Sequence, residues 1–163
     1  FDIRERISFY EKLCRSHGAL LFEDYEEVKG WMDWLMDTLD SMERPKCLCH
    51  IDANVDNFLF FEDGSVKLLD WEYAGMCDPV MDVSMCAIYS YYKEEDMERL
   101  FRLYLRREPS EDELFALYAN AALGGFLWCL WAVYKSILGD EFGEYTIIMY
   151  RYAKKYYRKL RKL

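Results

Sequence analysis

The sequence predicts a mainly α-helical domain that carries a small β-hairpin sheet, an α+β fold in a single domain over residues 1–163. Three observations support this prediction. Hydrophobic residues make up 53% of the chain, so a sizeable core can form. Most of the chain places apolar residues at spacings of three and four, which is typical of amphipathic helices. Only a central region shows short apolar runs joined by a tight turn, which is typical of strands.

Two amphipathic helices are predicted first, over residues 2–16 and 24–43. In both, apolar residues recur at helical spacing and fall on one face. Gly18 is a plausible stop for the first helix because glycine adopts the left-handed conformation of a helix end. Pro45 ends the second, since proline cannot continue a helix.

Three short strands are predicted next, at residues 47–50, 58–61 and 66–70. The last two flank E-D-G-S, and the Asp-Gly pair within that segment is a strong hairpin signal. Asp70 is therefore expected to end the second strand of the hairpin. We expect these strands to form a small sheet that lies on the helical body.

Three further helices are predicted at residues 80–92, 94–107 and 141–160, from the same apolar spacing. Between the second and third of these lies a long apolar helix that runs to about Leu138. The chain after residue 80 is therefore expected to be almost entirely helical.

The long apolar helix has two internal signals. Ser110 with Glu113 three residues later forms a capping box, which predicts the start of the helix. Gly124 and Gly125 lie inside the helix, where each glycine costs about 1 kcal/mol relative to alanine. A close helix crossing, or the close approach of a ligand, would offset that cost.

Composition excludes several classes of protein. The net charge of −9 argues against a nucleic-acid partner, which attracts basic surfaces. No run of about eighteen apolar residues occurs, so no membrane span is predicted. The six cysteines contain no C-x-x-C pair and are expected to be reduced thiols, which indicates a cytoplasmic location. Because Phe1 opens directly into an amphipathic pattern without a start methionine, we interpret the chain as a fragment of a longer protein.

Three polar residues between 49 and 82 form a candidate catalytic cluster: Asp52, Asn57 and Asp70. Alone, each would be a capping residue of a polar loop. Together they resemble the parts needed for phosphoryl transfer, where a carboxylate orients the acceptor hydroxyl and takes its proton. Carboxylate and amide oxygens are also suitable ligands for Mg²⁺. The pattern therefore predicts a magnesium-dependent phosphoryl-transfer site.

The motif pair C-H-I-D-A-N-V-D-N-F-L and L-L-D-W-E-Y-A-G-M-C-D-P-V-M-D resembles the choline/ethanolamine kinase family, in particular bacterial choline kinases of the LicA type. This family belongs with the aminoglycoside phosphotransferases in the protein-kinase-like fold. The resemblance implies that the chain is the C-terminal lobe, which carries catalysis and substrate binding. It implies ATP as co-substrate, Mg²⁺ as cofactor and an N-terminal nucleotide lobe as partner, since no G-x-G-x-x-G loop occurs here.

Matching positions imply roles around the catalytic loop. Asp52 would be the catalytic aspartate, and Asn57 and Asp70 would be the magnesium ligands. Asp82, in D-P-x-x-D, would support the catalytic loop. His50, which precedes that loop, is interpreted as a structural hydrogen bonder rather than a base or a ligand.

A second group is implied to bind the substrate. Glu72 and Tyr73 follow the metal aspartate as in choline kinases, and Trp128 with Trp131 resembles the W-x-x-W of the family. Tyr152 is a further candidate for the aromatic cage. Residues three apart on a helix project to one side, and a desolvated cation over an aromatic face gains about 2 kcal/mol. By spacing alone, however, the two tryptophans are better explained as core residues, and only the catalytic motif favours the cage.

The implied function is ATP-dependent phosphorylation of the hydroxyl group of choline to give phosphocholine. Two alternatives stay open. One is a kinase for another small alcohol, such as ethanolamine or an aminoglycoside. The other is a non-catalytic module that binds quaternary ammonium compounds. The isolated chain is expected to be nearly inactive, because half of the nucleotide cleft would belong to the other lobe.

Overall fold

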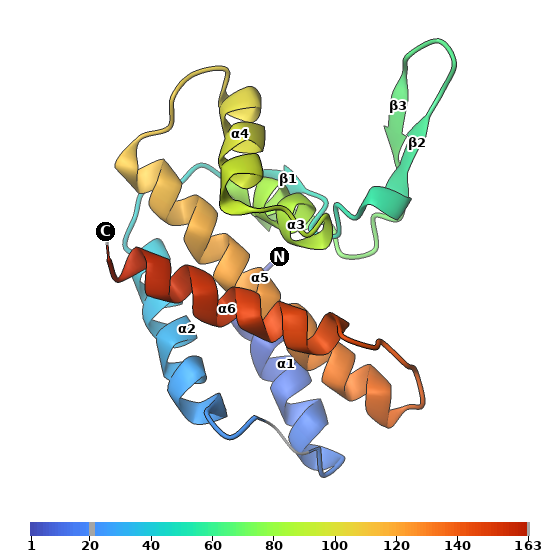
Figure 1. Cartoon of the computed structure of the whole chain (residues 1–163), viewed down its shortest axis with the longest axis vertical. Helices are drawn as coiled ribbons and strands as arrows, with labels where there is room; N and C mark the ends of the chain where they lie inside the picture. The colour runs from blue at the N-terminus through green and yellow to red at the C-terminus, as the bar shows by residue number, and fades with distance from the viewer. Residues whose placement is uncertain (20–21, 163) are drawn as a thin grey trace.

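A long central helix, α5, organises the fold, and the computed structural model describes residues 1–19 and 22–162 around it. Helix α5 packs against α6, α3, α1 and α2 (Figure 1). The elements in chain order are α1 (Ile3–Ser16), α2 (Tyr25–Asp40), β1 (Cys47–Cys49), the 3₁₀-helix η1 (Val55–Asn57), β2 (Phe58–Phe60), β3 (Val66–Leu68), β4 (Gly75–Cys77), α3 (Val80–Tyr89), α4 (Glu94–Leu105), α5 (Glu111–Ile137) and α6 (Tyr145–Leu160). The prediction of a mainly helical fold with short antiparallel strands is confirmed.

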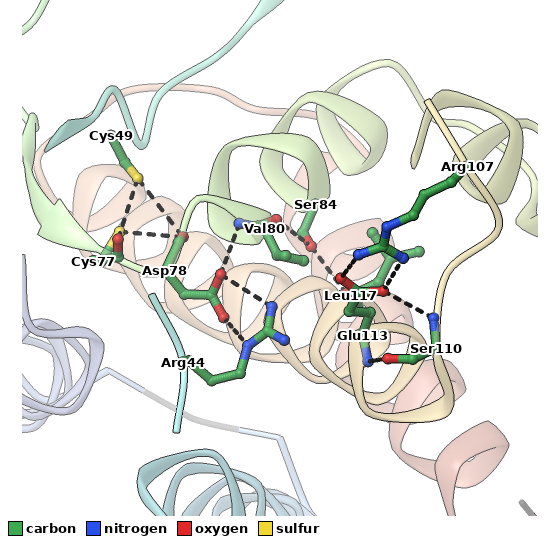
Figure 2. A network of polar contacts seen from close by, with 10 residues as sticks. All are labelled: Arg44, Cys49, Cys77, Asp78, Val80, Ser84, Arg107, Ser110, Glu113 and Leu117. Carbon is green, nitrogen blue, oxygen red and sulfur yellow. Dashed lines mark hydrogen bonds and ion pairs between the residues drawn. The ribbon is translucent and has the colours of Figure 1, made fainter. Parts of the chain in front are cut away.

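Helix α5 is buried on all sides for most of its length, as its sequence predicts. It begins with the expected capping box: the hydroxyl group of Ser110 accepts from the backbone N–H of Glu113, whose carboxylate accepts from the N–H of Ser110 (Figure 2). The hydroxyl group of Ser84 donates to the carbonyl oxygen of Leu117 at 2.9 Å. This hydrogen bond fixes α3 on α5 without leaving a buried hydroxyl group unpaired.

The two glycines of α5 lie at close contacts with neighbouring helices. A Cβ atom on Gly125 would lie 2.6 Å from the carbonyl oxygen of Met149 in α6. A Cβ atom on Gly124 would lie 2.7 Å from the sulfur of Met85 in α3. The expected close helix crossing is therefore confirmed on two sides of α5.

Two separate two-stranded sheets replace the single small sheet that was expected. Strand β1 pairs antiparallel with β4, with Cys47 opposite Cys77, and β2 pairs with β3 as the predicted hairpin. Strand β4 was missed because three residues in an acidic loop show no periodicity. The hairpin projects from the helical body (Figure 1).

Several predicted ends shift by a few residues. Strand β3 stops at Leu68, so Asp70 lies beyond the strand rather than at its end, in the left-handed region with φ 60°. Helix α4 ends at Leu105 because Arg106 has a left-handed backbone with φ 56°. The last helix starts at Tyr145 rather than at residue 141.

One helix of the described residues, α5, is long and apolar enough to cross a membrane by length and composition alone, with a mean hydropathy of 1.5 over its most apolar window. The sequence argument had found no such segment. In the structure 83% of that window is buried by other parts of the protein. Helix α5 therefore has the environment of a core helix.

Candidate active site

The loop after β1 is held by a carboxylate on α3. Asp82 accepts hydrogen bonds from the backbone N–H groups of His50 at 2.8 Å and Ile51 at 2.7 Å. Ile51 has φ 72°, a left-handed conformation that is costly for a β-branched residue. The two hydrogen bonds to one carboxylate stabilise this strained backbone and fix the position of Asp52 that follows. The structure thus places Asp82 where a supporting residue is required.

His50 joins this loop to the segment after the hairpin. Its Nε2 lies 2.6 Å from the carbonyl oxygen of Leu69, and since a carbonyl only accepts, Nε2 carries the proton. The imidazole ring also packs edge-on against Trp71, with 4.8 Å between ring centres. His50 is buried and makes these contacts as a bridging residue. It does not line the cavity described below.

Asn57 holds Asp52 in place. The amide nitrogen of Asn57 donates to the backbone oxygen of Asp52 at 3.0 Å and to its Oδ2 at 3.2 Å. The amide oxygen of Asn57 is therefore turned away from these contacts. On the other side, the N–H of Leu69 donates to the carbonyl oxygen of Asn57 at 2.8 Å. This hydrogen bond brings the residue before Asp70 next to Asn57.

The donor set of this region fits a magnesium ion that is shared with a nucleotide. Within residues 1–19 and 22–162, no group of three or more His, Cys, Asp or Glu side chains has the geometry of a metal site. Mg²⁺ in phosphate-transfer sites is held by one or two protein oxygens together with substrate phosphates. The amide oxygen of Asn57 and the exposed carboxylate of Asp70 are two such oxygens on adjoining segments.

A cavity of about 280 Å³ opens beside Asp52. Four segments that are distant in the sequence form its walls: the loop after β1, the loop before β4, the end of α3, and α5 with the start of α6. Its lining residues are Asp52, Asn54, Glu72, Tyr73, Tyr89, Trp128, Trp131, Phe142 and Tyr145. Two carboxylates and six aromatic rings therefore face one small space.

The aromatic rings of the cavity contact each other mainly edge to face. Tyr73 and Trp128 are 5.4 Å apart at 89°, and Trp128 and Trp131 are 5.8 Å apart at 80°. Trp131 and Phe142 are 5.0 Å apart at 62°. Such pairs fix the orientation of the rings that line the cavity.

The phenol groups of the cavity stay protonated at neutral pH. Burial, with smaller contributions from the nearby Tyr10 and Glu72, raises the pKa of Tyr73 to about 12. Burial also raises the pKa of Tyr89 and of Tyr145, and the charge of Asp52 adds to both shifts. These hydroxyl groups therefore keep a proton that they can donate to a ligand or a neighbouring group.

The structure brings together most of the predicted substrate residues but not all of them. Glu72, Tyr73, Trp128 and Trp131 line the cavity with Asp52. Tyr152 is not among the lining residues; its ring stacks on Tyr156 with 5.6 Å between centres. Tyr152 thus occupies a packing position on α6, beside Gly125.

Sequence reasoning missed four lining residues: Asn54, Tyr89, Phe142 and Tyr145. A signal existed for Tyr89, which lies seven residues after Asp82 and hence on the same face of α3. No local pattern marks Phe142 and Tyr145, because they reach the cavity only through the packing of α6 on α5.

Comparisons with known proteins agree with this geometry. Residues 4–117 match the model of the phosphotransferase enzyme family (APH). The chain is 27% identical over 152 residues to Protein LicA of Haemophilus influenzae, a match that covers 89% of this chain and 41% of that protein. It is 26% identical over 151 residues to Ethanolamine kinase 1 of Mus musculus, covering 76% of this chain and 42% of that protein.

Solved structures give the same result. The choline kinase LicA from Streptococcus pneumoniae superposes with a TM-score of 0.83 at 28% identity, over 98% of this chain and 56% of that chain. LicA in complex with AMP gives the same score. These matches confirm the resemblance to choline/ethanolamine kinases and the protein-kinase-like fold. The chain spans about half the length, or less, of the relatives it matches.

Proposed function

Because the chain belongs to the phosphotransferase enzyme family, we propose that it is the catalytic and substrate-binding lobe of an ATP-dependent kinase for choline. The observation that carries this proposal is the cavity in which the Asp52 carboxylate faces the same space as the rings of Trp128 and Trp131. The hydroxyl group of choline would contact the Asp52 carboxylate, and its trimethylammonium group would contact the two tryptophan rings. The cavity volume of about 280 Å³ suits such a small alcohol.

In this proposal Asp52 accepts the hydrogen bond of the alcohol, orients its oxygen and takes the proton as the phosphoryl group is transferred. Asn57 holds the Asp52 carboxylate from the opposite side. The amide oxygen of Asn57 and the carboxylate of Asp70 hold Mg²⁺. When bound, the ion neutralises charge on the phosphates of the nucleotide.

The cationic end of the substrate is recognised by the aromatic rings and by Glu72. A quaternary ammonium group offers no hydrogen bond, so ring faces and a nearby carboxylate are the groups that stabilise it. Trp131 already has a cation near it: the ammonium group of Lys135 lies 5.9 Å from the ring centre. A primary ammonium ion, such as that of ethanolamine, could also donate hydrogen bonds to the Glu72 carboxylate. Ethanolamine is therefore a second candidate substrate.

We further propose that a separate nucleotide lobe completes the cleft. Large apolar side chains on the β2–β3 hairpin and its flanks are exposed, with Phe60 at 77%. Several exposed large apolar side chains on one short element are typical of an interface. The lobe would cover the hairpin, and the complete protein would act in the cytoplasm, where the six cysteines, all free here, stay reduced.

A substrate panel tests the proposal. Full-length protein that contains this chain is incubated with Mg-ATP and choline, ethanolamine or kanamycin, and ADP release is measured. We expect the highest kcat/KM for choline, and a fall in kcat of about 10²- to 10⁴-fold in Asp52→Asn. Equal or higher kcat/KM for kanamycin, or full activity of the Asp52→Asn variant, would refute it.

The chain by itself provides the control for the second lobe. The isolated 163-residue chain is expected to bind choline, which quenches tryptophan fluorescence, but to release no ADP. Turnover by the isolated chain at the full-length rate would show that no second lobe is needed.

A further inference from the structure

A buried hydroxyl group in the cavity lacks a partner. In the described part of the chain, four buried side-chain nitrogen or oxygen atoms have no hydrogen-bond partner, on Tyr25, His50, Tyr89 and Asn120. Among these residues, Tyr89 alone lines the cavity that holds Asp52. An unpaired buried hydroxyl group is costly, so a native structure that retains one usually has a functional reason.

Tyr89 is rigidly placed on the element that supports the catalytic loop. It is the last residue of α3, and Asp82 in the first turn of the same helix holds the backbone before Asp52. Seven residues are two helical turns, so both side chains point from α3 toward the same region. The Tyr89 ring also packs against Trp128, with 5.8 Å between centres.

The catalytic carboxylate has one unsupported oxygen. Asn57 donates to Oδ2 of Asp52, and no donor of the described residues reaches Oδ1. The Tyr89 hydroxyl group lies near enough for the charge of Asp52 to raise the tyrosine pKa, although burial has the larger effect. Hydrogen bonds at catalytic groups are often long in a free enzyme and tighten when substrates bind.

We propose that Tyr89 is a positioning residue, whose hydroxyl group donates a hydrogen bond to the Asp52 carboxylate in the substrate-loaded enzyme. This inference rests on the proposed function and adds a residue that lies outside the catalytic motifs. With Asn57 on one oxygen and Tyr89 on the other, the carboxylate can no longer rotate. The lone pair that remains is then aimed at the alcohol hydroxyl group throughout the reaction.

The test separates positioning from packing. Tyr89→Phe keeps the ring and removes only the hydroxyl group. Tyr92→Phe is the matched control, because Tyr92 is exposed and lies outside the cavity. In full-length protein we expect Tyr89→Phe to lower kcat about tenfold to a hundredfold, with KM for choline and ATP unchanged and the thermal midpoint unchanged or higher, because the buried hydroxyl group has no partner in the free enzyme. Tyr92→Phe should leave all four values unchanged.

A double variant shows whether Tyr89 acts through Asp52. In an Asp52→Asn background, the added Tyr89→Phe substitution should cause no further loss of kcat, because the group that it positions is gone. The inference would be overturned, while the proposed function stands, by any of four results. In Tyr89→Phe these are an unchanged kcat, a rise in choline KM alone, or a lower thermal midpoint with unchanged kcat. In the double variant it is a loss of kcat that adds to that of Asp52→Asn. Absence of phosphoryl transfer in the wild-type protein would overturn both.

Discussion

Gly125 makes the α5–α6 packing directly testable. In Gly125→Ala, the new methyl carbon would lie 2.6 Å from the carbonyl oxygen of Met149, where ordinary contact begins near 3.4 Å. The helices would have to move apart by about 0.8 Å, and the atom in the way is backbone rather than a flexible side chain. Overpacking of this kind costs about 1–3 kcal/mol, which exceeds the gain of about 1 kcal/mol from replacing a helical glycine by alanine.

Gly30→Ala supplies the control for the propensity effect. Gly30 lies inside α2, and a Cβ atom there would have nothing within 4 Å. We expect this variant to raise the free energy of unfolding by about 0.5–1 kcal/mol, and Gly125→Ala to lower it, in urea titrations followed by far-UV circular dichroism. Stabilisation by Gly125→Ala equal to that by Gly30→Ala would show that α5 and α6 do not approach this closely.

Four further predictions follow from the helix cap, the catalytic loop and the cavity. Ser110→Ala should lower the free energy of unfolding by about 1 kcal/mol in the same titrations. Arg107 and the N–H of Ser110 lower the pKa of Glu113 from 4.5 to about 2. The stabilising contribution of the Glu113 carboxylate is therefore complete above pH 4.5 and is lost as the pH falls toward 2. Glu113→Gln should remove this part of the acid sensitivity, which thermal midpoints measured between these pH values would show. Asp82→Asn should lower kcat more than it raises KM, because it loosens the backbone before Asp52, and equal changes in the two would contradict that role. Trp131→Leu should raise the KM for choline up to about thirtyfold, because the cation loses an aromatic face. The KM for the uncharged alcohol in which a carbon atom replaces the nitrogen of choline should stay unchanged. A kinetic comparison of the two alcohols checks this.

Sequence patterns predict the local features of this protein well. The capping box at Ser110 and the hairpin around Gly64 depend on residues a few positions apart, so their signals are complete in the sequence. The paired glycines predicted a close contact in the same way. The proximity of the three proposed catalytic residues could also be predicted, because Asp52 and Asn57 lie on one loop and Asp70 follows a hairpin that returns to it.

Features that depend on tertiary packing were predicted poorly. Strand β4 is only three residues long and exists because it pairs with β1. The cavity walls at Phe142 and Tyr145 depend on the position of α6 relative to α5, which no local pattern encodes. Tyr152 shares a helix with Tyr145, yet it packs on Tyr156 instead of facing the cavity. Helical spacing alone could not distinguish these two tyrosines.

The two interpretations of Trp128, core residue or cage residue, turn out to be compatible. Its side chain is only 4% exposed and its indole N–H lies 3.3 Å from the sulfur of Met85, as in a core. The same ring lines the cavity beside Tyr73 and Trp131. A wall fixed by the core cannot rearrange when a ligand binds, so little conformational entropy is lost at that step. Rigid packing of α3 on α5, which Gly124 permits, is therefore what we expect to set the affinity of the site.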